Sequence, residues 1–166
     1  MARKLQIMMF LFVAAVACLA GDKDDLVNLK NKQWISVPSV PQVSMAAGQK
    51  TTVQLKFQVG DGFHINSHTP KSDLLIPTTL NFTPVEIMTV GNIDYPKGKE
   101  FSLSYDPSEK LSVYTGEVIL NVPLQASTRA KAGSYNVHAE IRYQACSDRA
   151  CFPPRSYPLD LTITIK

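Results

Sequence analysis

The fold is decided by a run in which polar and apolar side chains alternate, Thr51-Thr52-Val53-Gln54-Leu55-Lys56-Phe57-Gln58-Val59. Successive residues of a β-strand point to opposite faces of a sheet. The apolar residues at the odd positions from Val53 to Val59 would therefore share one face, and the polar residues the other. This pattern predicts an antiparallel strand with one buried face and one solvated face.

The same alternation recurs along the chain and is separated by turn-forming residues. It is present at residues 85–90, 116–123, 135–143 and 157–165. Turn residues separate the runs at 60–62, 106–108 and 132–134. No long stretch carries apolar residues at helical spacing. The sequence therefore predicts an all-β fold, an antiparallel immunoglobulin-like β-sandwich over residues 34–166.

Length and composition limit the function classes. The chain has 166 residues, a single-domain length, and 45% of them are apolar, which argues against disorder. Its 17 Lys and Arg against 14 Asp and Glu give a formal charge of only +3. Because no basic block or basic-aromatic stripe is present, nucleic acid is not an expected partner.

The first twenty residues have the features of an export signal. Arg3 and Lys4 precede an uninterrupted apolar or small run over residues 7–20, and no acidic residue occurs before Asp22. This run is shorter than the roughly 20 residues that span a bilayer, so we interpret residues 1–20 as a signal peptide and 21–33 as a flexible lead-in. The protein is then periplasmic or otherwise exported.

Lipidation is the second interpretation of the same segment. Cleavage before Cys18 would leave an N-terminal cysteine for lipid attachment, although Ala15 stands where lipoprotein signals usually have leucine. Only a lipoprotein of this kind would be attached to a membrane. An uncleaved anchor ranks third.

Removal of residues 1–20 lowers the formal charge to +1, because Arg3 and Lys4 are lost, and leaves two cysteines, Cys146 and Cys151. Exported compartments tolerate disulfides, so these two cysteines are a potential pair. Both lie in the connection between the strands predicted at 135–143 and 157–165. Their spacing leaves three interpretations open: a structural disulfide, a redox-active pair or part of a metal site.

The metal interpretation has the weakest support. His64 and His68 are four residues apart, but no second close pair of ligands accompanies them, as zinc sites usually require. A copper-binding sandwich could combine these histidines with Met45 or Met88. We predict neither a metal nor an organic cofactor.

Three separated segments resemble one known family. They are residues 142–154, which contain Tyr143, Gln144, both cysteines and the pair Pro153-Pro154; residues 61–67 together with 75–78; and residues 113–118. This arrangement resembles the N-terminal periplasmic domain of the thiol:disulfide interchange protein DsbD, over about residues 37–165. The cysteine segment is the most specific part of the resemblance.

The resemblance implies a component of protein-disulfide reduction. In that family an immunoglobulin-like domain takes electrons from a thioredoxin-like donor and passes them to exported thiol-disulfide proteins. Cys151 would form the mixed disulfide with the partner, and Cys146 would resolve it. The alternative is a non-catalytic immunoglobulin-like binding module with a structural disulfide or a copper site.

The resemblance also implies residues that surround the cysteines. The family covers its cysteine pair with an aromatic residue of a cap loop, for which Phe101 and Tyr105 are the candidates here. His64 is a candidate for tuning the pair. Tyr143 precedes the cysteines, and Asp148 lies between them, where its charge disfavours a thiolate.

Overall fold

The structure, a computed structural model, describes residues 32–103 and 106–166, and its folded unit comprises Gln33–Lys166. The predicted signal peptide, Cys18, residues 21–31 of the lead-in and Tyr105 lie outside the described residues. No helix in the described ranges is long and apolar enough to cross a membrane.

The described residues form twelve strands and no helix. The strands are β1 (Ile35–Ser36), β2 (Val43–Met45), β3 (Lys50–Val59), β4 (His64–Asn66), β5 (Thr79–Phe82), β6 (Met88–Val90), β7 (Lys99–Leu103), β8 (Asp106–Tyr114), β9 (Glu117–Ala126), β10 (Gly133–Tyr143), β11 (Ala145–Cys146) and β12 (Arg155–Ile165).

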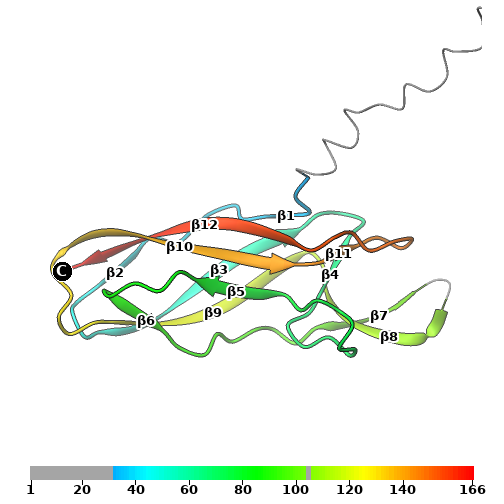
Figure 1. Ribbon diagram of the computed structural model, residues 1–166, viewed down its shortest axis with the longest axis horizontal. Coiled ribbons are helices and arrows are strands. Elements are labelled where there is room, and N and C mark those ends of the chain that lie inside the picture. The colour runs from blue at the N-terminus through cyan, green and yellow to red at the C-terminus, as the bar shows by residue number, and fades with distance from the viewer. Residues whose placement is uncertain (1–31, 104–105) are drawn as a thin grey trace, which may run out of the picture. The chain divides into compact units, whose positions relative to one another are not determined.

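Two four-stranded sheets pack face to face as a sandwich (Figure 1). One sheet has the order β1-β3-β9-β6, and the other has the order β2-β12-β10-β5. The chain crosses between the sheets after β1, and β2 then pairs with β12 in parallel, whereas the other paired strands of the described residues are antiparallel. The predicted all-β, immunoglobulin-like sandwich is confirmed, with β2–β12 as its parallel exception.

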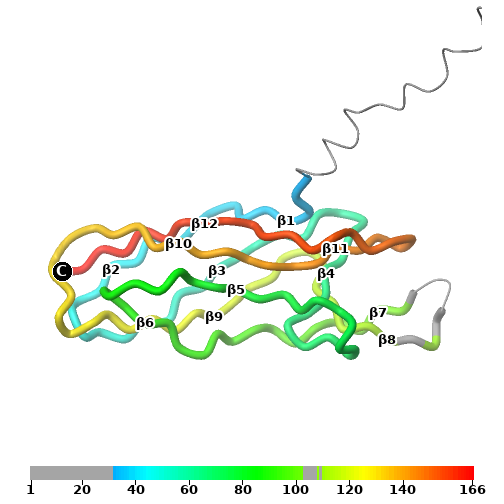
Figure 2. Tube along the Cα trace, viewed as in Figure 1, coloured from blue at the N-terminus to red at the C-terminus, as the bar shows by residue number. Residues whose placement is uncertain are grey.

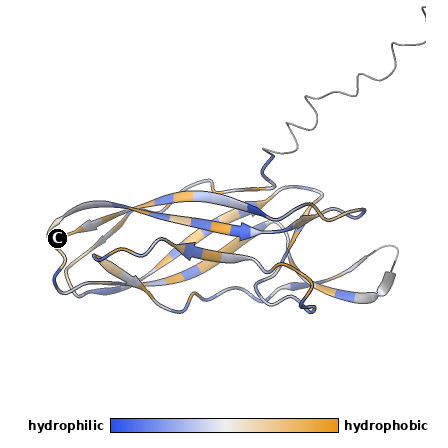
Figure 3. Ribbon diagram, in the orientation of Figure 1, coloured by the Kyte–Doolittle hydropathy of each residue, from blue (hydrophilic) through white to orange (hydrophobic). Residues whose placement is uncertain are grey.

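Apolar side chains on the two inner faces form the core. Burial alternates along β3, β9, β10 and β12, as the period of a strand requires. Figure 3 shows the accompanying mixture of hydrophobic and hydrophilic residues along these strands. Phe57 of β3 and Ile141 of β10 are 0% exposed. Complete burial of one such side chain contributes about 1.5–3 kcal/mol, so the facing rows account for much of the stability of the sandwich.

Four of the five predicted strands are present within a few residues of their predicted bounds, as parts of β3, β9, β10 and β12. The prediction of a strand at 85–90 is wrong for residues 85–87. Only Met88–Val90 forms a strand there, and Val85 and Met88 instead make an isolated bridge across a tight turn. Pro84, which lacks a backbone donor, precedes this turn and disfavours an earlier start of the strand.

A third sheet, with the order β11-β4-β8-β7, lies at one end of the sandwich (Figure 2). The chain turns from β3 into β4 at residues 60–62. Gly62 has φ +76°, a left-handed conformation that a residue without Cβ adopts readily. This turn brings β4 beside β11, with Ile65 opposite Ala145 and His64 opposite Cys146.

Tyr143, the last residue of β10, ties the start of the folded unit to the sheet. Its side chain is 0% exposed, and its hydroxyl accepts a hydrogen bond from the Trp34 backbone N–H at 3.1 Å. The same hydroxyl donates to Gln33 Oε1 at 2.6 Å. Burial raises the pKa of the Tyr143 phenol. The hydroxyl therefore stays protonated and holds the chain entry beside the end of β10.

We expect Tyr143→Phe to lower the free energy of unfolding by about 1–3 kcal/mol, because the buried Trp34 N–H loses its partner. Denaturant unfolding followed by circular dichroism measures the change.

The matched control is Tyr135→Phe. The Tyr135 hydroxyl donates to the Lys131 carbonyl at 2.9 Å in an exposed bond, which water replaces. This variant should change the free energy of unfolding by less than about 0.5 kcal/mol. Equal losses in the two variants would contradict the anchoring role of Tyr143.

Candidate functional site

Cys146 and Cys151 form a disulfide across a hairpin. The two residues face each other in an antiparallel bridge, with their Cα atoms 3.9 Å apart. Hydrogen bonds flank the pair on both sides, from Phe152 N–H to the Ala145 carbonyl and from Ser147 N–H to the Ala150 carbonyl, each 2.8 Å. The cysteines therefore occupy a non-hydrogen-bonded position, where opposed side chains come closest.

Ser147 closes the turn of this hairpin. Its hydroxyl lies 3.3 Å from the Arg149 N–H and 3.3 Å from the Ala150 N–H, both of which are donors to it. The hydroxyl also lies 3.3 Å from the Ala150 carbonyl, to which it donates. Asp148 and Arg149 occupy the exposed tip of the turn. The turn thus brings the cysteines together without a helix.

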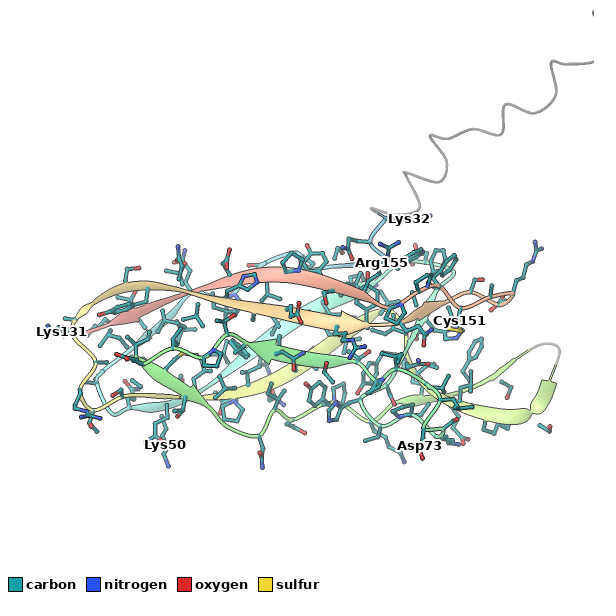
Figure 4. All side chains as sticks on the ribbon, in the orientation of Figure 1. Lys32, Lys50, Asp73, Lys131, Cys151 and Arg155 are labelled. Carbon is teal, nitrogen blue, oxygen red and sulfur yellow. A yellow bond between two sulfur atoms is a disulfide. The ribbon has the colours of Figure 1, made fainter. Side chains whose placement is uncertain are left out.

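The two cysteines differ in accessibility. Cys146 is 2% exposed and lies in β11, which pairs with β4. Cys151 follows the turn and is exposed, and Figure 4 shows it near the end of the sandwich opposite Lys131. Thiol-disulfide exchange requires in-line attack on an accessible sulfur. Of the two disulfide-bonded residues, Cys151 is therefore the more accessible.

His64 lies directly beside the buried cysteine. It is the β4 residue opposite Cys146, so the two side chains project to the same face of the sheet. The imidazole is 2% exposed, and its buried Nε2 atom has no hydrogen-bond partner. Burial lowers the pKa of His64, and the negative charge of Asp148 partly opposes this shift. At neutral pH the imidazole is therefore uncharged.

Phe101 of β7 covers the imidazole. Its ring centroid lies 4.3 Å from that of His64. Of the two predicted cap residues, Phe101 is thus placed against the neighbour of Cys146, and Tyr105 lies outside the described residues. The sheet order β11-β4-β8-β7 explains how residues so far apart in sequence meet.

An aromatic cluster supports the other side of the hairpin. Phe152, next to Cys151, stacks on Trp34 with ring centroids 4.5 Å apart. The ring centroid of Phe63 lies 6.0 Å from that of Phe152. The Arg155 guanidinium lies over the Trp34 ring at 5.4 Å. The backbone N–H of Trp34 donates to the Tyr143 hydroxyl, which fixes the position of Trp34. The sequence interpretation assigned no role to Trp34 or Phe152, although an aromatic residue beside a cysteine was a signal for one.

Side-chain amides connect the hairpin to the body of the sheet. Gln144 Nε2 donates to the Phe152 carbonyl at 3.2 Å, and Gln144 Oε1 accepts from Asn66 Nδ2 at 3.3 Å. Asn66 Nδ2 also donates to the Ile76 carbonyl at 3.0 Å. The Thr78 hydroxyl donates to the Asn66 carbonyl at 2.6 Å. These bonds fix β4, the 76–78 segment and the hairpin to one another.

The residues of the predicted copper alternative do not come together. Met45 and Met88 are buried core residues of β2 and β6, which lie at the end of the sandwich opposite β4, the strand of His64 (Figure 1). His68 stacks on Tyr95, with ring centroids 3.7 Å apart, and its Nδ1 lies 3.0 Å from the Thr78 carbonyl. Within the described ranges, no group of three or more His, Cys, Asp and Glu residues could hold a metal ion.

Solved structures resemble this chain at low sequence identity. The reduced DsbD N-terminal domain of Neisseria meningitidis matches with 20% identity and a TM-score of 0.46, over 71% of this chain and 82% of that chain. The N-terminal periplasmic domain of ScsB from Proteus mirabilis matches with 16% identity and a TM-score of 0.48, over 71% of this chain and 42% of that chain.

A third similar structure is a complex between the DsbD and PilB N-terminal domains of Neisseria meningitidis. It matches with 20% identity and a TM-score of 0.42, over 73% of this chain and 80% of that chain. These distant likenesses assign no residue a role. The sequence has no match among the curated proteins.

A family model gives the assignment that these likenesses do not. The model of the N-terminal domain of the thiol:disulfide interchange protein DsbD matches residues 31–162. This range contains both sheets of the sandwich almost completely, together with the cysteine hairpin and the strands beside it. The chain therefore belongs to the family of DsbD N-terminal domains.

Proposed function

We propose that this protein carries electrons between a thioredoxin-like donor and exported disulfide proteins through the Cys146–Cys151 pair. Family membership implies thiol-disulfide exchange in general. The difference in burial between the two sulfur-bearing residues carries the specific proposal, with Cys151 exposed and Cys146 2% exposed. A disulfide with one accessible sulfur has a defined point of entry for a partner thiolate.

Reduction of the protein begins with attack on Cys151. A donor thiolate attacks Cys151 Sγ, the bond between the two cysteines breaks, and Cys146 leaves with the electron pair and takes up a proton. The second thiol of the donor then attacks the donor sulfur that is bonded to Cys151 and releases Cys151 as a thiol. Two electrons and two protons have passed to the protein, and the donor is left as a disulfide.

Oxidation by an acceptor follows the same route in the opposite direction. The Cys151 thiolate attacks the acceptor disulfide, and one acceptor sulfur leaves as a thiol. Cys146 then attacks Cys151 Sγ, restores the internal disulfide and releases the second acceptor thiol. Neither step needs an organic cofactor or a metal, because the sulfur atoms carry the electrons.

The surroundings of the hairpin suit a passive carrier in an oxidising compartment. Cys146 is buried opposite His64, whose ring packs on Phe101, while the Trp34–Phe152 stack fixes the exit of the hairpin. The export signal predicted at residues 1–20 is consistent with a periplasmic or otherwise exported location, in which such a carrier would meet oxidised proteins.

We expect Cys146→Ala to capture a thioredoxin that retains only its first active-site cysteine, supplied as its mixed disulfide with thionitrobenzoate. The exposed Cys151 thiol should displace thionitrobenzoate and remain joined to the thioredoxin, because no Cys146 thiol is left to resolve the bond. Absorbance follows the displacement, and peptide mass spectrometry locates the junction.

Cys151→Ala is the matched control, since it also keeps one thiol of the same hairpin. Burial of Cys146 should make its capture at least about tenfold slower. Equal capture rates in the two variants would contradict the assignment of Cys151 as the entry point.

We also expect the pair to have a reduction potential above about −300 mV, since structural disulfides typically fall below this value. Equilibration with a dithiothreitol redox buffer, followed by alkylation of free thiols and mass spectrometry, measures it. A value well below this limit would favour the binding module with an inert disulfide.

A further inference from the structure

His64, Cys146 and Cys151 form one row across three neighbouring strand segments. His64 is opposite Cys146, and Cys146 is opposite Cys151. Directly opposed residues project to the same face, with Cβ atoms about 4.5–5.5 Å apart. The order across the sheet is therefore His64, Cys146 and Cys151, with the buried Cys146 in the middle.

Resting on the function proposed above, we propose that His64 is the base that accepts the Cys146 proton when Cys146 resolves a mixed disulfide on Cys151. Its Nε2 is buried and has no partner while the disulfide is closed. A buried polar atom without a partner costs free energy. After reduction, Cys146, the residue opposite His64, carries an S–H group that can donate to this nitrogen.

The proton and electrons of the resolving step balance. The neutral imidazole takes the proton of the Cys146 thiol, and the Cys146 thiolate attacks Cys151 Sγ. The bond between Cys151 and the partner sulfur breaks, and the partner leaves with its electron pair. The imidazolium then returns the proton to the partner thiolate or to solvent. The sum of this step is conversion of the mixed disulfide and the Cys146 thiol into the internal disulfide and a partner thiol, so the Cys146 sulfur is oxidised and the partner sulfur is reduced.

The surroundings of His64 favour an imidazole that is neutral at rest and able to hold a proton briefly. Burial lowers its pKa, whereas Asp148 on the hairpin turn acts in the opposite direction. Cys146 of β11 is the ionisable group opposite it, and β7 contributes the uncharged ring of Phe101. Asp148 is thus the charged group that stabilises the imidazolium during the transfer.

A two-phase reaction separates the two cysteines. The reduced full chain is mixed with excess 5,5′-dithiobis(2-nitrobenzoic acid), and absorbance follows the thionitrobenzoate. The first phase reports attack by Cys151 on the reagent. At high reagent concentration the second, unimolecular phase reports attack by Cys146 on the mixed disulfide. Mass spectrometry verifies that the product is the internal disulfide.

We expect His64→Phe to slow the second phase by at least about tenfold at neutral pH, as loss of a general base typically does, and to leave the first phase within about twofold. Phenylalanine keeps a ring against Phe101 but accepts no proton. His64→Gln supplies a second variant with a polar side chain, in case the phenylalanine variant does not fold. The control is His138→Phe, which replaces an exposed histidine of β10 that bonds to Asp160.

The pH profile distinguishes a base from a packing residue. In the wild type the second-phase rate should rise through the pKa of His64, which burial lowers, and then level off, because only the neutral imidazole accepts the proton. In His64→Phe it should instead rise in proportion to hydroxide through neutral pH. Asp148→Asn removes the charge that raises the His64 pKa, so the midpoint should move to lower pH.

Each outcome decides between two propositions. An unchanged second phase in both folded His64 variants, or equal slowing of both phases, overturns the role of His64 and leaves the exchange function intact. Release of a single thionitrobenzoate by the wild type overturns the exchange function itself, because Cys146 would then not resolve the mixed disulfide. Selective slowing with the altered pH profile supports the base.

Discussion

One apolar layer between two sheets is the constraint on which the rest of the structure depends. A strand contributes to this layer only if every second side chain is apolar, and β3, β9, β10 and β12 all satisfy this condition. A shift of the register by one residue would turn an entire buried row outward. The pairing of β10 with β12, from Gly133 opposite Ile165 to Tyr143 opposite Arg155, is therefore tightly specified by burial.

The cysteine hairpin is held at the end of the paired strands β10 and β12. β10 ends at Tyr143 and β12 begins at Arg155, and the hairpin with both cysteines lies between these two residues in the chain. Two residues separate Tyr143 from Cys146 and three separate Cys151 from Arg155, so the register shifts by one residue before the cysteine bridge, where Cys146 faces Cys151. A disulfide re-forms readily after reduction only if its two cysteines stay close together. Here the long ladder holds the hairpin ends at a fixed separation when the bond is absent.

The two cysteines differ in solvent exposure because different segments pack against them. The two residues lie in the same short hairpin and share most of their sequence context. Pairing with β4 places His64 against Cys146, and β7 adds the ring of Phe101 above it. The return segment after the turn has no such cover at Cys151, which is exposed. The two cysteines of one disulfide thereby differ in burial, which is the difference that the proposed roles of Cys151 and Cys146 use.

The sequence by itself determined the all-β class, four of its strands and the pairing candidates Cys146 and Cys151, because period-two alternation and a short cysteine spacing are local properties. It placed the 85–90 strand wrongly in its first half, where Pro84 and a turn outweighed the apolar pattern. Only the tertiary structure decided that Cys146 is buried, that His64 stands opposite it and that Trp34 stacks on Phe152. These contacts join residues far apart in the chain, so they depend on sheet order and register, which no local pattern contains.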